Sequence, residues 1–279
     1  MAPQDAVLGW DEDTTAEAYA AFTHDFPMYG RTSRDLAHRA GLAGSSLVVD
    51  LCGGAGATAQ EILDLVPMQA EVISVDNAAA MQRVGRRTVL DPRLTWVTAP
   101  AEDLADHVPD PADAVVCNSA IWKTNVRAVV AAVHQALRPG GRFVFNIGGG
   151  FAGVRHPDEI SARTGPSLNS LIHQVAARGY GYVAPSAVEM SPKLPLETVI
   201  EHLTASGMTL LDSEVVAEHS IMAEKKAWLS IPIFARPVGE FTHAQRMDIL
   251  DKAYSLTRPD APTVTSWLVV VAQRPREGR

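Results

Sequence analysis

An acidic residue and a group of glycines lie where they could form a binding site for a nucleoside. Residues 47–60, LVVDLCGGAGATAQ, begin with an apolar, β-branched run that reaches Asp50. Three glycines follow, Gly53, Gly54 and Gly56. Glycine lets the backbone turn sharply and lets a ligand touch bare amides, and a helix that starts there offers unpaired N–H groups. The segment therefore predicts a strand, a glycine turn and a helix around a ligand.

A second acid follows the next predicted strand. Residues 71–76, EVISVD, end at Asp76, which lies 22 residues after Gly54. An acid about 20 residues beyond such a turn can accept both hydroxyls of a ribose. In a dinucleotide site the glycines would read G-x-G-x-x-G and face a pyrophosphate, whereas here the spacing is D-x-C-x-G-x-G. The spacing disfavours a nicotinamide oxidoreductase.

The turn resembles the first motif of class I S-adenosylmethionine-dependent methyltransferases. In that family the turn packs against the amino-acid part of the ligand, and no phosphate is bound. Cys52 stands where the family often has glycine, and we interpret it as a tolerated small residue.

Later segments resemble further motifs of the family, in the family's order. After a predicted strand at 94–97, residues 101–104 are similar to the segment that flanks the adenine, and either Glu102 or Asp103 could meet its amino group. After another predicted strand at 113–117, residues 118–122 resemble the motif beneath the methyl donor. A predicted helix over 126–137, the turn 138–141 and a strand over 142–147 complete the match.

The resemblance implies S-adenosylmethionine as the cofactor. The residues it implies for cofactor binding are Tyr29, Asp50, Cys52, Gly53, Gly54, Gly56, Asp76, Asn77, Met81, Ala101, Glu102, Asp103, Asn118 and Ser119.

The order of elements predicts the fold class. Strand and helix patterns alternate between residues 47 and 147, which requires parallel strands joined by right-handed crossovers. Ligands in such sheets bind beyond the carboxyl ends of the strands, so we expect the acids and Asn118 to converge. Together with the resemblance, this predicts a doubly wound α/β fold with a mostly parallel seven-stranded sheet and helical cap insertions. The last strand, 263–273, is expected to be antiparallel, at or near the sheet edge.

We expect the chain to divide into a core and a cap. The segments are an N-terminal helical lid at 1–43, the cofactor-binding core at 44–150, a cap insertion at 151–193, a core helix and strand at 194–221, a second cap insertion at 222–260, and the last strand with its tail at 261–279. Residues 1–12 are expected to be loose. Insertions of this length are typical of segments that shape a substrate pocket.

Methyl transfer is an in-line displacement, so the enzyme must mainly align the acceptor and exclude water. A base helps when the acceptor is a hydroxyl or an acidic carbon. The candidate bases are His24 and His173, with Glu159 and Glu189 as further carboxylates in the cap. Each is also compatible with an ordinary solvated or hydrogen-bonded side chain. Candidates for the substrate pocket are Phe26, Trp122 and Trp228, for which plain core packing is the alternative.

Composition narrows the partners. The net charge is −8 and no basic stripe occurs, which argues against binding DNA or RNA. The two cysteines rule out a disulfide framework, and the histidines show no metal-ligand spacing. No apolar run approaches the roughly 18 residues that span a bilayer, and the first residues lack a secretory pattern. We expect a cytoplasmic protein without membrane, nucleic-acid or metal partners, with a homodimer as one possibility.

These observations predict methyl transfer to carbon or oxygen of a small, partly hydrophobic metabolite, in specialised metabolism. Two alternatives remain open. The fold could use S-adenosylmethionine without transferring its methyl group, while the cap promotes a cyclisation or decarboxylation. The chain could also be a non-catalytic ligand-binding subunit.

Overall fold

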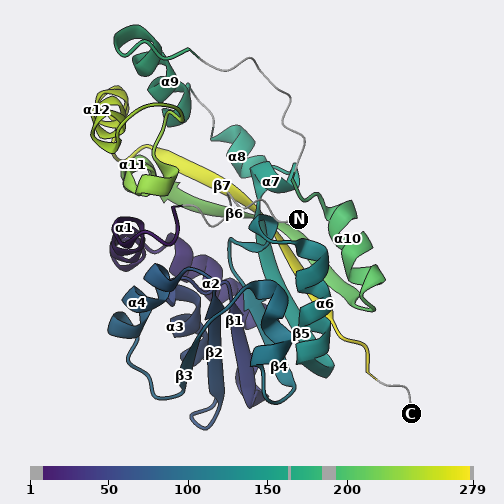
Figure 1. Cartoon of the computed structure of the whole chain (residues 1–279). Coiled ribbons are helices and arrows are strands. Elements are labelled where there is room, and N and C mark those ends of the chain that lie inside the picture. The colour runs from purple at the N-terminus through teal and green to yellow at the C-terminus, as the bar shows by residue number, and fades with distance from the viewer. Residues whose placement is uncertain (1–8, 163–164, 184–192, 277–279) are drawn as a thin grey trace.

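The structure is a computed structural model that describes residues 9–162, 165–183 and 193–276 (Figure 1). Within these residues the strands form one seven-stranded sheet in the order β3-β2-β1-β4-β5-β7-β6. The strands are β1 (Leu47–Leu51), β2 (Glu71–Asp76), β3 (Leu94–Thr98), β4 (Ala112–Cys117), β5 (Leu137–Gly148), β6 (Thr209–Ile221) and β7 (Pro262–Gln273). β1 to β5 are parallel, while β7 runs antiparallel between β5 and β6. The expected mostly parallel sheet is confirmed, and β7 lies one strand in from the edge.

Helices cover both faces of this sheet. One face packs against α2 (Met28–Ala40) and α3 (Ala57–Leu63) through the Leu36 and Ile62 side chains, with α4 (Ala79–Thr88) alongside. The other face packs against α5 (Leu104–His107), α6 (Val126–Ala136) and α10 (Leu196–Ala205). Every residue of β1 is buried, as expected for a parallel strand covered on both sides. The doubly wound arrangement is confirmed.

The cap stands on an extension of two strands. β6 and β7 stay paired as far as Ile221 and Pro262, whereas the pairing of β7 with β5 ends at Trp267. The sequence placed this strand within residues 194–221, and the observed β6 continues to the last of these residues, Ile221. The extension exists because residues 218–221 pair with the β-branched run at the start of β7.

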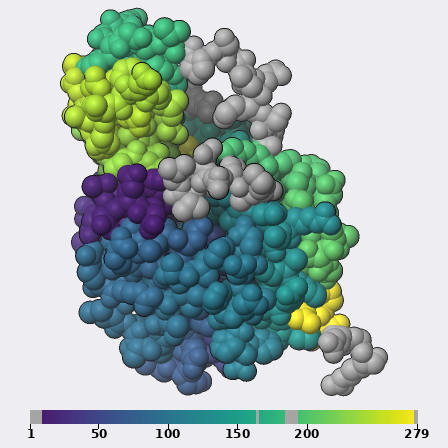
Figure 2. All heavy atoms as spheres, in the orientation of Figure 1, coloured from purple at the N-terminus to yellow at the C-terminus, as the bar shows by residue number. Residues whose placement is uncertain are grey.

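Three helices gather at the far end of this extension. They are α9 (Leu168–Gly179), α11 (Met222–Ser230) and α12 (His243–Tyr254), and their apolar side chains share one cluster that includes Ile172, Leu229 and Ile249. Figures 1 and 2 show these helices beyond the core, and α11 is the one that lies next to α1 (Asp13–Asp25). Two short helices, α7 (Gly149–Ala152) and α8 (Pro157–Ser161), follow β5. The division into core and cap segments at the boundaries given above remains a prediction.

The N-terminal segment connects the cap to the core. Phe22 of α1 and Tyr29 of α2 pack with Ile231, which follows α11. The expectation that residues up to 12 are loose is wrong for those the structure describes. Trp10 packs edge-on against Tyr19 and Phe234, at centroid distances of 5.8 and 5.4 Å.

Candidate cofactor site

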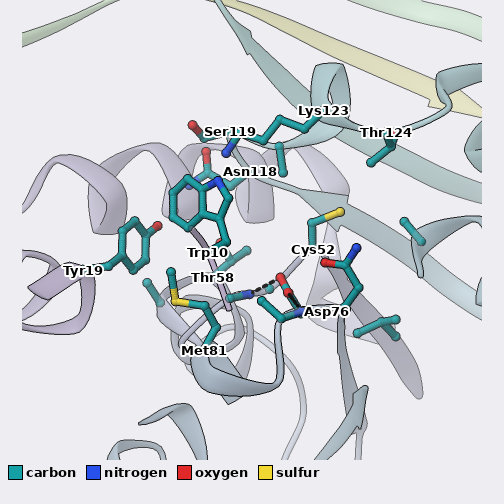
Figure 3. Close-up of a pocket in the computed structure, with 18 of the residues that line it drawn as sticks. Trp10, Tyr19, Cys52, Thr58, Asp76, Met81, Asn118, Ser119, Lys123 and Thr124 are labelled. Carbon is teal, nitrogen blue, oxygen red and sulfur yellow. Dashed lines mark hydrogen bonds between the residues drawn. The ribbon is translucent and has the colours of Figure 1, made fainter. Parts of the chain in front are cut away.

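A pocket lies where the carboxyl ends of β1, β2 and β4 meet (Figure 3). It has a volume of about 1080 Å³ when the space at its open mouth is included. Side chains from α1 and α2 and from the segment around Trp10 form its outer wall. Ligand pockets in open α/β sheets occur at this edge.

The glycine turn after β1 forms the pocket floor. Gly53 lies directly over two buried side chains, because a Cβ there would lie 2.3 Å from Asp50 Oδ2 and 2.2 Å from Ser74 Oγ. Gly54 has φ +56°, and a Cβ there would meet nothing within 4 Å, so the space beside its Cα is open. Close packing below and an open pocket above therefore explain this pair of glycines.

Asp50 supports the turn from beneath and does not line the pocket. The Ser74 hydroxyl donates to Asp50 Oδ2 at 3.2 Å. Complete burial raises the pKa of Asp50 to about 7, against the lowering effect of the Ser74 hydrogen bond. Gly56 is also absent from the lining. It begins α3 with φ +91°, and a Cβ there would lie 2.6 Å from Trp96.

Asp76, at the end of β2, ties this strand to the turn. Its Oδ2 accepts the N–H of Gly54 at 2.9 Å, and its Oδ1 accepts the N–H of Ala78 at 2.7 Å. Burial raises the pKa of Asp76, while these two N–H groups and the nearby Lys123 ammonium lower it. Each carboxylate oxygen can accept more than one hydrogen bond, so Asp76 retains capacity for ligand hydroxyls.

Asn118, after β4, is held in place by its neighbours. Its Nδ2 donates to Ser33 Oγ at 2.8 Å and to Thr32 Oγ1 at 3.1 Å. Asn146 of β5 donates to Asn118 Oδ1 at 2.8 Å and accepts the N–H of Ser119 at 2.6 Å. Asn146 is 1% exposed, so it is a positioning residue that sequence reasoning missed.

Among the residues that the structure describes, two other than glycine have positive φ, and both border the pocket. They are Cys52, at φ 58°, and Ser119, at φ 59°. A side chain in this left-handed region costs on the order of 1 kcal/mol. The position of Cys52, where the resembling family often has glycine, is thus one that favours glycine.

Tyr29 links the pocket to the cap. Its hydroxyl accepts the indole N–H of Trp228 at 3.1 Å, and its ring lies 5.1 Å from that of Tyr19. Burial raises the pKa of Tyr29 to about 12 and also raises that of Tyr19. Both hydroxyls therefore stay protonated at neutral pH.

The structure brings most of the expected cofactor residues together. Those that line the pocket are Tyr29, Cys52, Gly53, Gly54, Asp76, Asn77, Met81, Ala101, Glu102, Asn118 and Ser119. Asp103, the alternative to Glu102, is exposed and does not line it. Glu102 accepts the N–H of Asn125 at 2.8 Å.

The other candidates lie outside the pocket lining. Phe26 stacks on Phe22 at 5.2 Å, Trp122 stacks on Phe151 at 4.7 Å, and Trp228 stacks on Phe234 at 4.0 Å. Their rings pack against other aromatic rings, which is the alternative that the sequence left open.

None of the candidate bases that the structure describes lines the pocket. The His24 side chain is 88% exposed and pairs with Asp25. His173 lies on the exposed side of α9 against Tyr182. Glu159 accepts the Ser266 hydroxyl at 2.5 Å, and Glu189 lies outside the described residues. These positions argue against assigning any of the first three as a base.

Five polar or aromatic residues of the described lining were not anticipated: Trp10, Tyr19, Thr58, Lys123 and Thr124. Lys123 directly follows the segment 118–122, which resembles the motif beneath the methyl donor. This position was the available signal. Trp10 lies between the short apolar run 6–8 and the acidic residues 11–13, and this context gave no indication of a pocket.

The described residues offer no evident metal site. They contain no group of three or more His, Cys, Asp or Glu side chains placed to hold a metal ion. They also contain no helix whose length and apolar character would let it cross a membrane.

Comparisons with known proteins agree with this geometry. Residues 48–141 match the family described as a methyltransferase domain. The ubiquinone/menaquinone biosynthesis C-methyltransferase UbiE of Coxiella burnetii is 35% identical over 102 residues, which are 34% of this chain and 39% of that protein. The chain thus matches well under half the length of this relative.

Solved structures extend the likeness to the fold of nearly the whole chain. Phosphoethanolamine N-methyltransferase 2 of Haemonchus contortus, solved with S-adenosylhomocysteine, superposes with a TM-score of 0.56 at 18% identity, covering 98% of this chain and 60% of that one. The [4+2]-cyclase SpnF gives a TM-score of 0.54 at 15% identity, covering 89% and 82%. Residues 48–141 therefore carry a methyltransferase domain, as the motifs predicted, and the expected fold is confirmed.

Proposed function

We propose that this chain, a class I methyltransferase whose cofactor is S-adenosylmethionine, methylates a carbon or oxygen atom of a small, partly hydrophobic metabolite. One observation carries the proposal. The glycine turn and Asp76 are joined by the 2.9 Å hydrogen bond from the Gly54 N–H, and both open into one pocket with Asn118. This pocket can hold a nucleoside at one end and an amino acid at the other.

The residues present fit that cofactor. Asp76 has remaining acceptor capacity for the two ribose hydroxyls. Ala101 and Glu102 lie at the edge next to β3, where the adenine would lie. Gly54 leaves space above the turn for the amino-acid part. When bound, the cofactor supplies an electrophilic methyl group on sulfur.

The chain's own contribution is alignment and exclusion of water. Asn118 and Ser119 are fixed by Asn146, so the floor near the reacting centre is rigid. Tyr29 and Tyr19 form an aromatic wall joined to the cap through Trp228. A closed, oriented pocket is the main requirement for an in-line displacement.

The acceptor proposal rests on the cap and on the relatives. The cap is rich in apolar side chains, which favours a partly hydrophobic substrate. The UbiE relative is named as a C-methyltransferase, which favours carbon over oxygen. A role in specialised metabolism, a place in the cytoplasm and a homodimer belong to the same proposal.

The test is incubation of the purified chain with S-adenosylmethionine carrying a deuterated methyl group and with small-molecule extracts, followed by mass spectrometry. The proposal predicts a product that gains a labelled methyl group. A product formed without label would instead support a cyclisation or decarboxylation. This alternative is considered because a protein of similar fold is a [4+2]-cyclase. Binding of S-adenosylhomocysteine without turnover of any extract would favour a ligand-binding subunit.

A further inference from the structure

We propose that Lys123 makes this pocket selective for a ligand that presents an anionic oxygen beside Trp10. The inference rests on the proposed function and deepens it, because it names a chemical group that the bound molecules must carry. No motif or comparison assigned a role to this residue.

The geometry places an ammonium group inside the pocket. Lys123 ends the short 3₁₀-helix η4 (Ile121–Lys123) and lines the pocket. Its Nζ lies 4.1 Å from the centroid of the Trp10 ring and 5.7 Å from that of Trp122. Figure 3 shows the side chain extended from the β4 side toward Trp10.

No carboxylate among the described residues forms an ion pair with this ammonium. Lys123 is the only basic side chain in the pocket lining, and it forms no ion pair within 4 Å in the described part of the chain. The two acids of the lining have other partners, since Asp76 accepts two backbone N–H groups and Glu102 accepts a third.

The surroundings of the ammonium make this arrangement costly without an anion. The groups that face it are the Asp76 carboxylate and the thiols of Cys52 and Cys117. Burial lowers the pKa of Lys123 to about 8, although these groups oppose the shift. The side chain is still mainly protonated at neutral pH. A half-buried cation that forms no ion pair with the described residues is an expected position for a ligand's charge.

The ligand chemistry is an anionic oxygen, and two molecules could supply it. One is the donor, through the carboxylate of its amino-acid part. The other is the acceptor, through an ionised hydroxyl, enolate or carboxylate. A fixed ammonium would repel the donor's sulfonium unless an anion lay between or beside them.

Binding measurements separate these sources. The probes are S-adenosylhomocysteine and 5′-methylthioadenosine, which shares the nucleoside and thioether but lacks the amino acid, titrated calorimetrically into the wild type, Lys123→Met and Lys123→Arg. If Lys123 holds the donor's carboxylate, Lys123→Met weakens S-adenosylhomocysteine binding at least tenfold and leaves 5′-methylthioadenosine unchanged. Lys123→Arg should restore most of the affinity.

The acceptor arm uses 4-nitrophenol, whose anion is visible by absorbance, and neutral nitrobenzene, each with the S-adenosylhomocysteine complex. If the acceptor supplies the anion, the wild type binds 4-nitrophenolate at least tenfold more tightly than nitrobenzene and lowers the apparent pKa of the bound phenol. Lys123→Met then loses both effects, and Lys123→Arg keeps them.

Lys225→Met is the matched control. Lys225 is also half-buried and lies over an indole, with Nζ 4.4 Å from the Trp228 ring centroid, but it is outside the pocket lining. Lys225→Met should therefore bind S-adenosylhomocysteine, 5′-methylthioadenosine, 4-nitrophenolate and nitrobenzene as the wild type does.

The proposal is overturned if Lys123→Met has an unchanged melting temperature and binds both S-adenosylhomocysteine and 4-nitrophenolate as tightly as the wild type. It is also overturned if Lys225→Met weakens these affinities as much as Lys123→Met does. Failure of the wild type to bind S-adenosylhomocysteine would instead contradict the proposed function. The two failures are therefore distinguishable.

Discussion

The carboxylate of Asp76 accepts the N–H of Gly54 at 2.9 Å, although 22 residues and a whole helix separate them in the sequence. The end of β2 and the glycine turn after β1 are therefore one structural unit. Substitution of either residue should therefore change the affinity for a ligand that contacts both.

Removal of the acid should weaken donor binding directly. Asp76→Ala should raise the dissociation constant for S-adenosylhomocysteine by the equivalent of about 1–3 kcal/mol, the scale of hydrogen bonds to a charged group. Calorimetric titration measures this value. Asp103→Ala is the matched control, since that acid is exposed and outside the pocket. Equal affinity of Asp76→Ala and the wild type would show that Asp76 does not hold the ribose.

Addition of one methyl group beneath the turn should be strongly destabilising. Gly53→Ala would place a carbon 2.2–2.3 Å from the Ser74 and Asp50 oxygens. Overpacking of this kind costs about 1–3 kcal/mol or more in the free energy of unfolding. Gly150→Ala, where a Cβ meets nothing within 4 Å, should leave the unfolding curve nearly unchanged. Similar denaturation midpoints for the two variants would contradict the packing described here.

The pH dependence of stability should carry the signature of Asp50. Its pKa is about 7 in the folded chain, against an ordinary value of 3.8 for an exposed aspartate. Because the pKa of Asp50 is higher in the folded chain, its protonated form stabilises the fold. This contribution to the free energy of unfolding is fully present below about pH 3.8 and is lost as the pH rises through 7. Asp50→Asn should therefore raise the free energy of unfolding at about pH 8 relative to wild type, and by about 1–3 kcal/mol more than at about pH 5. Denaturant titrations at both pH values check this, and a constant difference between the two proteins would contradict it.

The contact between lid and cap should be measurable as a coupling. Tyr29→Phe and Trp228→Phe each remove one partner of the 3.1 Å hydrogen bond. A double-mutant cycle on the free energy of unfolding should give about 1 kcal/mol of interaction. Additive effects would mean that this hydrogen bond does not join the two segments in solution.

The sequence was most informative where local chemistry dictates structure. Gly53 and Gly54 are required by the backbone of the turn, and Asp76 stands at the end of a strand that its apolar residues predict. All three residues could therefore be recognised without coordinates. The mostly parallel sheet could also be anticipated, because alternating strands and helices require crossover connections between parallel strands.

The missed features depend on contacts between distant segments. Lys123 and Trp10 meet across the pocket although 113 residues separate them in the chain, and no periodicity encodes such a meeting. His24 was a candidate because of its place in the predicted lid, and His173 because of its place in the predicted cap, yet both side chains lie outside the pocket lining. The extension of β6 to Ile221 depends on pairing with β7, which is known only once the two strands lie together.

The most direct test of the central claim is a crystal structure of the chain with S-adenosylhomocysteine. The account predicts that both ribose hydroxyls lie within hydrogen-bond distance of the Asp76 carboxylate and that the amino-acid part lies over Gly53 and Gly54. A nucleoside bound elsewhere on the chain, with Asp76 making no contact to it, would contradict the account.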